Sequence, residues 1–238
     1  MPIRMSMDLK TIYDTLMKLF GEQQWWPVDQ VYHKKQGSDP RFEIILGAIL
    51  TQNTAWTNVE KALTNLKKEN ALSMRKILTM DSEELKTLIR PSGFFNQKAQ
   101  RIKQITKYLD NKYSGELYTF FHQEPLRIRA ELLSLPGIGP ETADSILLYA
   151  GNHPIFVVDA YTKRVSKRIP LPIKEDTYDA YQHFFDTELR KIIPTDALVS
   201  IYKEYHALLV ELAKQYCTKN TPACSRCPLQ GYCVSVLG

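Results

Sequence analysis

Four cysteines lie close together near the end of the chain: Cys217, Cys224, Cys227 and Cys233, with the spacing C-x6-C-x2-C-x5-C. Thiolates bind soft metals, and four of them can hold an iron–sulfur cubane or a tetrahedral zinc ion. The first residues lack the apolar core and the cleavage site of a secretory signal, so we expect a reducing compartment and no disulfides. The spacing therefore predicts a metal or cluster loop, with iron–sulfur and zinc both open.

A glycine hairpin, Leu135-Pro-Gly-Ile-Gly139, is the second feature that could do chemistry. Gly137 and Gly139 permit backbone angles and close approaches that a Cβ would forbid. Pro140 suits the first turn of a helix, where backbone N–H groups are unpaired and attract anions such as phosphate. The alternative is a plain helix–turn–helix connection that binds nothing.

Asp159 follows the apolar run Ile155–Val158 and is the third feature. A carboxylate held in a dry pocket can stabilise a cationic transition state or accept a proton from water. Asp is also a common N-cap, and a helix is expected to begin near Ala160. The two roles are compatible.

The elements that must position these residues are helices, because apolar residues recur at helical spacing along most of the chain. Polar or Pro/Gly breaks at Trp25-Trp26-Pro27, Thr51–Thr54 and Pro91–Asn96 separate them. The expected helices cover about residues 8–20, 41–67 with an interruption at 51–54, 72–80, 82–89, 98–109, 125–134, 140–151, 160–168, 176–191 and 195–216. Alternating strand and helix patterns are missing and only 155–158 is ambiguous between strand and loop, so the prediction is an all-α fold.

The totals limit the classes of function. The chain has 238 residues, and 31 Lys and Arg against 26 Asp and Glu give a net charge of +5, which permits nucleic-acid binding without proving it. The hydrophobic content of 44% indicates a globular protein. No apolar run approaches the roughly 18 residues of a membrane span. We expect a cytoplasmic monomer with no membrane partner.

Together the hairpin, the Val158-Asp159 pair and the cysteine spacing resemble the helix-hairpin-helix DNA glycosylases related to endonuclease III, over about residues 25–233. The resemblance implies two helical domains that form a DNA-binding cleft, one of residues 41–150 and one of 1–40 plus 151–238. It implies a [4Fe–4S] cluster on the four cysteines as the cofactor. It also implies a partner, double-stranded DNA containing damaged bases, whose phosphates the hairpin residues Leu135, Gly137, Ile138 and Gly139 would hold.

Two further residues acquire roles from the resemblance. Gln52 matches the glutamine that plugs the hole left by a flipped-out base, and Phe94 matches the bulky residue that wedges the opposite strand. Inserted side chains recover part of the stacking lost on base flipping. Taken alone, Gln52 could be a polar helix end and Phe94 a buried loop aromatic.

Glu141 departs from part of the family. Bifunctional members carry at this place a lysine that attacks the sugar and forms a Schiff base. A glutamate cannot do so, and the resemblance then leaves Asp159 as the catalytic residue of a monofunctional glycosylase that releases the base with water.

Gly47 is a second departure, because adenine-excising members place a carboxylic acid there to protonate the leaving base. A site without an acid suits alkylated purines such as 3-methyladenine, which carry a positive charge and leave unaided. Trp25, Trp26 and Phe42, with Glu141, resemble the base pocket of a 3-methyladenine glycosylase branch. An aromatic face attracts a cationic base by roughly 0.5–2 kcal/mol, although core packing would also explain the tryptophans.

Two rival functions stay open at this point. A bifunctional glycosylase for oxidised pyrimidines would need another lysine, and a DNA-binding homologue could have lost the chemistry. The basic residues of 163–168 could line DNA or form a solvated face. The five histidines show no ligand spacing and receive no assignment.

Overall fold

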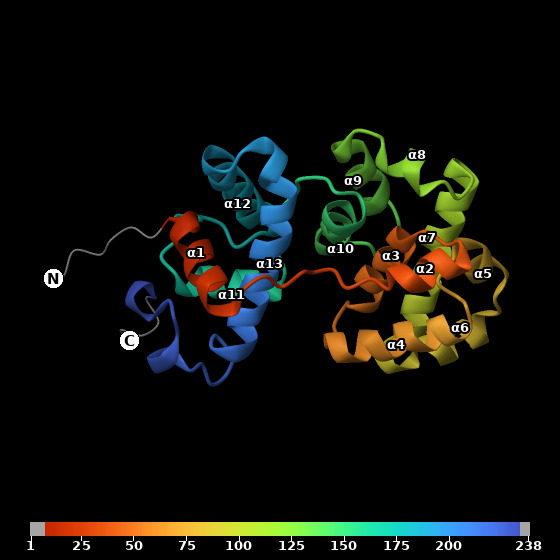
Figure 1. The fold of residues 1–238 in the computed structure, drawn as a ribbon, viewed down its shortest axis with the longest axis horizontal. Coiled ribbons are helices and arrows are strands. Elements are labelled where there is room, and N and C mark those ends of the chain that lie inside the picture. Colours follow the sequence, from red (N-terminus) through yellow and green to blue (C-terminus); the bar gives the residue numbers. More distant parts are fainter. Residues whose placement is uncertain (1–7, 234–238) are drawn as a thin grey trace. The chain divides into compact units, whose positions relative to one another are not determined.

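The computed structural model describes residues 8–233, and every regular element in that range is helical, which confirms the all-α prediction. The chain divides into two compact units (Figure 1). Unit 2 contains residues 26–153, and unit 1 contains residues 8–25 together with 154–233. The division after Trp25 differs from the expected one after residue 40, so residues 26–40 belong with the module that follows them.

Unit 2 consists of short helices packed around one buried helix. Its elements are α2 (Gln30–Gln36), α3 (Pro40–Leu50), α4 (Trp56–Lys68), α5 (Met74–Thr79), α6 (Ser82–Ile89), η1 (Arg90–Ser92), α7 (Phe95–Tyr113), α8 (Leu117–Phe121), α9 (Pro125–Leu133), α10 (Pro140–Ser145) and η2 (Ile146–Ala150). Every residue of α3 from Phe42 to Leu50 is buried, and α3 contacts α4, α7, α10 and η2. The hydrophobic effect thus makes α3 the core of this unit.

A buried polar group explains why α2 belongs to unit 2. Glu43 on α3 is 1% exposed, and its carboxylate lies 2.8 Å from His33 Nε2 of α2 and 3.0 Å from Lys67 Nζ of α4. A buried carboxylate is tolerated only when it is paired, so these contacts tie α2 to α3 and α4.

Capping residues set several helix starts in unit 2. The Asp39 carboxylate accepts the Arg41 N–H at 2.9 Å with Pro40 in the first turn, and Asp81 caps α6 through the Glu83 N–H at 2.7 Å. Both are standard N-terminal signals, so the expected starts near residues 41 and 82 agree with the structure.

Unit 1 is built on its last long helix. Its elements are α1 (Leu9–Phe20), α11 (Ala160–Arg168), α12 (Tyr178–Ile192), η3 (Thr195–Ala197), α13 (Leu198–Gln215), η4 (Cys224–Arg226) and η5 (Gln230–Tyr232). Helix α13 contacts both α1 and α11. The ambiguous run Ile155–Val158 is buried without regular structure, and Phe156 stacks on Phe185 with 4.6 Å between ring centres. Asp159 therefore follows a firmly packed segment.

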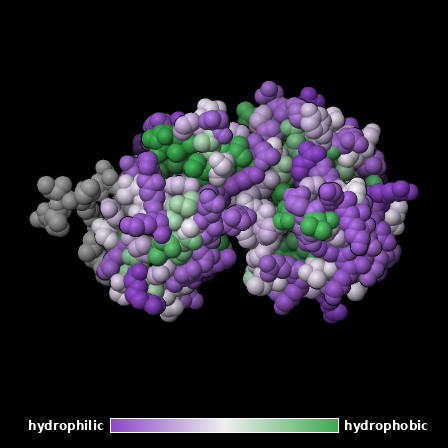
Figure 2. All heavy atoms as spheres, in the orientation of Figure 1, coloured by the Kyte–Doolittle hydropathy of each residue, from purple (hydrophilic) through white to green (hydrophobic). Residues whose placement is uncertain are grey.

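The visible surface is mostly hydrophilic, with hydrophobic atoms in small groups (Figure 2). Among the described residues, no helix combines the length and apolar character that a membrane crossing requires.

Candidate functional site

The glycine hairpin joins α9 to α10. The Ile138 N–H donates to the Leu135 carbonyl at 3.1 Å, and Gly137 has φ +82°, which a residue with a Cβ adopts only under strain. Gly139 is the extended N-cap of α10. The Ile138 side chain is 5% exposed and anchors the hairpin in the core. Ile138 can therefore offer a ligand only its backbone. The two glycines are exposed and offer their backbone to solvent.

A partly buried ion pair connects the two helices that flank the hairpin. Arg129 of α9 donates from Nε to Asp144 Oδ1 at 2.6 Å and from Nη2 to Oδ2 at 3.1 Å. Asp144 of α10 is fully buried. A bidentate pair fixes distance and orientation together, so it holds α9 and α10 in one geometry.

Gln52 lies in the turn after α3 and contacts the hairpin directly. Its Nε2 donates to the Gly137 carbonyl at 3.0 Å and to Thr142 Oγ1 at 2.9 Å, and its Oε1 accepts from Arg101 Nη1. A Cβ on Gly137 would lie 2.1 Å from Arg101 Nε, so this glycine also makes room for Arg101. Gln52, the predicted plug, is thus bonded directly to the hairpin and also to Arg101, a residue that belongs to none of the sequence motifs.

Phe94 immediately precedes α7 and is exposed to solvent. Its side chain is 62% exposed and its φ is +45°, after Gly93 at +67°. A large apolar residue that is both exposed and in the left-handed region is uncommon, and such strain clusters at functional sites. The alternative of a buried loop aromatic does not fit these values.

Trp26 packs on Gly47. A Cβ on Gly47 would lie 2.7 Å from Trp26 Cζ2, so any side chain at this position of α3 would displace the indole. Trp26 also contacts Trp56 edge-on, with 5.2 Å between ring centres, and Tyr149 of η2 at 5.3 Å. Trp26 and Trp56 are partly exposed. Gly47, Trp26, Trp56 and Tyr149 form what we call the aromatic platform.

The other predicted pocket residues have different surroundings. Phe42 is 1% exposed and belongs to the core of unit 2, where it offers no surface to a base, so we do not retain it in the site. Trp25 ends the N-terminal segment of unit 1 and is partly exposed. Glu141 is exposed in the first turn of α10.

Asp159 is the N-cap of α11, as expected. Its Oδ1 accepts the Thr162 N–H at 2.6 Å, and its Oδ2 lies 3.7 Å from His206 Nε2 on α13. Burial raises the pKa of this carboxyl, but His206 and the Thr162 N–H outweigh burial and hold the pKa below its usual value. The carboxylate is therefore charged at neutral pH. Sequence reasoning assigned no role to His206, since only the packing of α13 against α11 brings it to Asp159.

Lys98 is a buried amine of unit 2. Its Nζ donates to the Leu50 and Ser92 carbonyls, both at 2.7 Å, and the residue is 1% exposed. Burial, with a smaller contribution from Arg101, lowers its pKa to about 8. A lowered pKa can mark a nucleophile, but Lys98 is enclosed and closes the end of α3, which is a structural role.

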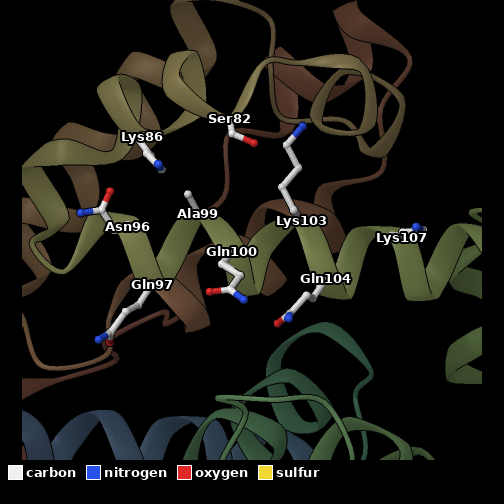
Figure 3. Close-up of a pocket in the computed structure, with 9 residues that line it drawn as sticks. All are labelled: Ser82, Lys86, Asn96, Gln97, Ala99, Gln100, Lys103, Gln104 and Lys107. Atoms are coloured by element: carbon white, nitrogen blue, oxygen red, sulfur yellow. The ribbon is translucent and has the colours of Figure 1, made fainter.

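A polar trench of about 510 Å³ lies between α6 and α7 (Figure 3). Gln97, Gln100 and Gln104 project from one side of α7, whereas Lys103 points the other way. Lys103 Nζ donates to the Ile77 carbonyl at 2.5 Å and to the Met80 carbonyl, and Lys86 pairs with Glu83 at 2.7 Å. These two lysines of the trench are thus already engaged within the unit.

The four cysteines lie around one cavity. Cys217, Cys224, Cys227 and Cys233 all line it, none is in a disulfide, and η4 and η5 are the two turns of this loop. Burial, and then the three neighbouring cysteines, raise the pKa of the Cys227 thiol. Within residues 8–233, no three Cys, His, Asp or Glu side chains already stand as a metal-ligand group. The donor set of four cysteines fits a cluster or zinc.

Two arginines on α11 hold the start of this loop. Arg168 donates to Cys217 Sγ at 3.1 Å and to the Thr218 carbonyl at 2.9 Å, and Cys233 Sγ donates to the Arg168 carbonyl at 3.0 Å. Arg164 donates to the Cys217 carbonyl at 2.7 Å. Both arginines are thus engaged with the cysteine loop, whereas a DNA-lining role for residues 163–168 stays a prediction. The guanidinium of Arg168 is placed to stabilise a Cys217 thiolate.

This all-α arrangement, with a glycine hairpin between two short helices and a capped aspartate after it, defines a helix-hairpin-helix protein. Residues 46–191 match the family described as "HhH-GPD superfamily base excision DNA repair protein". The chain belongs to this superfamily, and it is a DNA glycosylase of base excision repair.

Proteins of similar sequence or structure support this assignment to the DNA glycosylases. A "Putative DNA repair glycosylase" of Methanocaldococcus jannaschii is 45% identical over 225 residues, which cover 94% of each chain. The 3-methyladenine DNA glycosylase of H. pylori, solved with 1,N6-ethenoadenine, is 29% identical with a TM-score of 0.69 and covers 88% of this chain and 98% of that one. A trapped endonuclease III–DNA covalent intermediate is 26% identical with a TM-score of 0.73 and covers 94% and 93%.

Proposed function

We propose that this protein is a monofunctional DNA glycosylase that flips damaged bases out of duplex DNA and releases them by hydrolysis, with alkylated purines such as 3-methyladenine as substrates. Unit 2 would supply the grip on DNA through the hairpin, Gln52 and Phe94, and the aromatic platform for the base. Unit 1 would supply the carboxylate of Asp159.

The aromatic platform is the observation that carries the substrate class. The Trp26 indole occupies the space over Gly47, where an acid would otherwise stand. Glu43, one turn earlier on α3, is buried and paired with His33 and Lys67. A base that is already cationic needs no proton to leave and is attracted to an indole face.

Asp159 supports the hydrolytic step. As the C1′–N bond breaks, its electron pair goes to the base, which becomes neutral, and positive charge develops on the sugar. The charged Asp159 would stabilise that charge. Water then bonds to C1′ and gives up a proton through Asp159. Because its pKa is lowered, Asp159 is a weak base, and its main contribution would be electrostatic.

Glu141 is the reason for proposing that the protein has no lyase activity. This exposed carboxylate stands on α10 at the place where the resemblance puts the Schiff-base lysine of bifunctional members. Lys98, an amine of unit 2 whose pKa is lowered, is buried and donates its hydrogen bonds to backbone carbonyls.

We also propose that the four cysteines hold a [4Fe–4S] cluster. When bound, the cluster would supply a cross-link within the loop through four Fe–S bonds. Arg164 and Arg168 would attach that loop to α11. The protein would act as a monomer.

A panel of lesions tests this function. Duplexes carrying 3-methyladenine, 7-methylguanine, uracil, mispaired thymine or thymine glycol are incubated with the protein, and base release and strand cleavage are scored separately. We expect release of the alkylated purines, an intact backbone, and no adduct on borohydride treatment. Release of pyrimidine lesions alone would refute the substrate class, and a trapped adduct would refute the monofunctional mechanism.

Asp159→Asn tests the catalytic carboxylate. Asn keeps the helix cap, so folding should be preserved while base release falls by about 10²–10³-fold. Asp176→Asn, which alters an exposed aspartate of unit 1 paired with Lys167, is the matched control and should retain full activity. Unchanged release by Asp159→Asn would refute this role.

A further inference from the structure

The carboxylate of Asp159 is held at both oxygens by different helices. Oδ1 accepts the Thr162 N–H of α11 at 2.6 Å, and Oδ2 faces His206 Nε2 of α13 at 3.7 Å. The side chains of Asp159 and His206 are 14% and 10% exposed, so solvent screens this contact little. A simple helix cap needs only the first of these contacts.

We propose that His206 is a positioning residue for the hydrolytic reaction: its imidazole holds the second oxygen of Asp159, so that the carboxylate stays charged and fixed at the start of α11. This inference rests on the proposed role of Asp159. The carboxylate is the group that would face the sugar, and His206 would act only through it.

The other charged groups of α11 point elsewhere. Lys163 Nζ lies over the Tyr181 ring at 5.5 Å. Arg164 donates to the carbonyls of Cys217 and Ala213. Lys167 pairs with Asp176, and Arg168 is bound to the cysteine loop. The positive charges of its own helix are therefore engaged away from Asp159.

Tyr178, Lys203 and Tyr205 are titratable groups on the neighbouring helices α12 and α13. Tyr178 of α12 accepts the Val158 N–H at 3.4 Å beside Asp159. On α13, Tyr205 donates to the Leu9 carbonyl of α1 at 2.8 Å, and burial lowers the pKa of Lys203, one turn before His206. Of these groups and those of α11, His206 is the one whose side chain stands within 4 Å of the Asp159 carboxylate in an ion-pair geometry.

Two opposing effects act on Asp159. Burial alone would raise the pKa of the carboxyl, and contact with His206 is the largest influence that lowers it, followed by the Thr162 N–H. Without His206, burial would be opposed only by the helix N-terminus. The carboxyl would then take up a proton at a higher pH and lose the anion that the transition state requires.

The first experiment measures the carboxyl directly in the full-length protein. The pKa of Asp159 is followed by ¹³C NMR of Asp-labelled protein from about pH 3 to pH 8, with Asp159→Asn to assign the signal. We expect His206→Leu to raise this pKa by about 1 unit or more, and His206→Gln, which keeps a donor, to raise it less. The control is His183→Leu, an exposed histidine of α12 in the same unit, which should leave it unchanged.

The second experiment measures single-turnover base release against pH at saturating enzyme. We expect the acid limb of the His206→Leu profile to move to higher pH, with partial recovery in His206→Gln and unchanged duplex affinity. An unchanged Asp159 pKa in a folded His206→Leu protein overturns the inference, whether or not any lesion is released. If the pKa moves but wild-type protein releases no base from any lesion, the proposed function fails and the contact between His206 and Asp159 stands.

Discussion

Replacing Gly137 with alanine perturbs two features of the hairpin at once. The residue has φ +82°, and an added Cβ would lie 2.1 Å from Arg101 Nε and 2.7 Å from its Cδ. Both distances are far inside van der Waals contact, so Arg101 would have to move. Movement of Arg101 would break its hydrogen bond to Gln52. Gln52 in turn donates a hydrogen bond to the Gly137 carbonyl.

The expected loss of stability in Gly137→Ala follows from these effects. A left-handed conformation costs a residue with a Cβ about 1–2 kcal/mol, and the lost hydrogen bond to Gln52 costs about 1 kcal/mol. The reduced entropy of the unfolded chain offsets about 0.4–1 kcal/mol. We expect Gly137→Ala to destabilise the protein by about 1–3 kcal/mol.

Urea unfolding of the full chain measures this, with Gly139→Ala as the control. Gly139 lies two residues away in the same hairpin and has φ −92°, and a Cβ added to it would meet no atom within 4 Å. Its replacement should change stability by less than about 1 kcal/mol. In an Arg101→Ala background, the cost of Gly137→Ala should fall by about 1 kcal/mol, because only the backbone strain remains.

Equal effects of the two alanine variants would refute the argument from backbone conformation. A double-mutant cycle with no coupling between Gly137 and Arg101 would refute the argument from packing.

Two other predictions concern buried contacts. Lys98→Met should cost about 2–4 kcal/mol, because the Leu50 and Ser92 carbonyls lose their donor. The pKa of Lys98 is about 8 in the folded protein, against 10.5 for an ordinary lysine, so the unfolded chain binds this proton more tightly than the folded chain does. The free energy of unfolding of the wild-type protein, relative to that of Lys98→Met, should therefore increase as the pH rises between these two values. Urea unfolding of both proteins at several pH values measures this difference. Arg168→Gln removes the donor to Cys217 Sγ. If the proposed cluster is bound, this change should speed the loss of its absorbance near ~400 nm after chelator is added, and an unchanged rate would contradict the role of Arg168.

The sequence was most informative where local chemistry decides the structure. Helix starts at Asp39 and Asp81 follow from capping, and the hairpin follows from Gly137, Gly139 and Pro140. In these places a residue's own backbone preference and its near neighbours set the conformation, so residue types and their spacing were sufficient to predict the local structure.

It was least informative where contact depends on packing between distant segments. His206 reaches Asp159 only because α13 packs on α11, and Arg101 reaches Gly137 only across unit 2. Neither residue stands in a motif, and a buried histidine has no spacing signal of its own. Phe42 shows the converse, because the resemblance placed it in the base pocket, whereas it is only 1% exposed and packing in the core is enough to explain it.

The π turn of η2 gives the aromatic platform a property that loops lack. Where the sequence suggested one continuous helix over 140–151, residues Ile146–Ala150 form a π turn, and the Gly151 N–H bonds back to Ile146 at 3.1 Å. A π turn contains one residue more than the α turn it replaces. Deleting a single residue there would restore the α pattern and rotate the flanking side chains by about 100°. Tyr149 would then lose its contact with Trp26. The number of residues in this segment is therefore fixed, whereas a surface loop of equal size could gain or lose a residue.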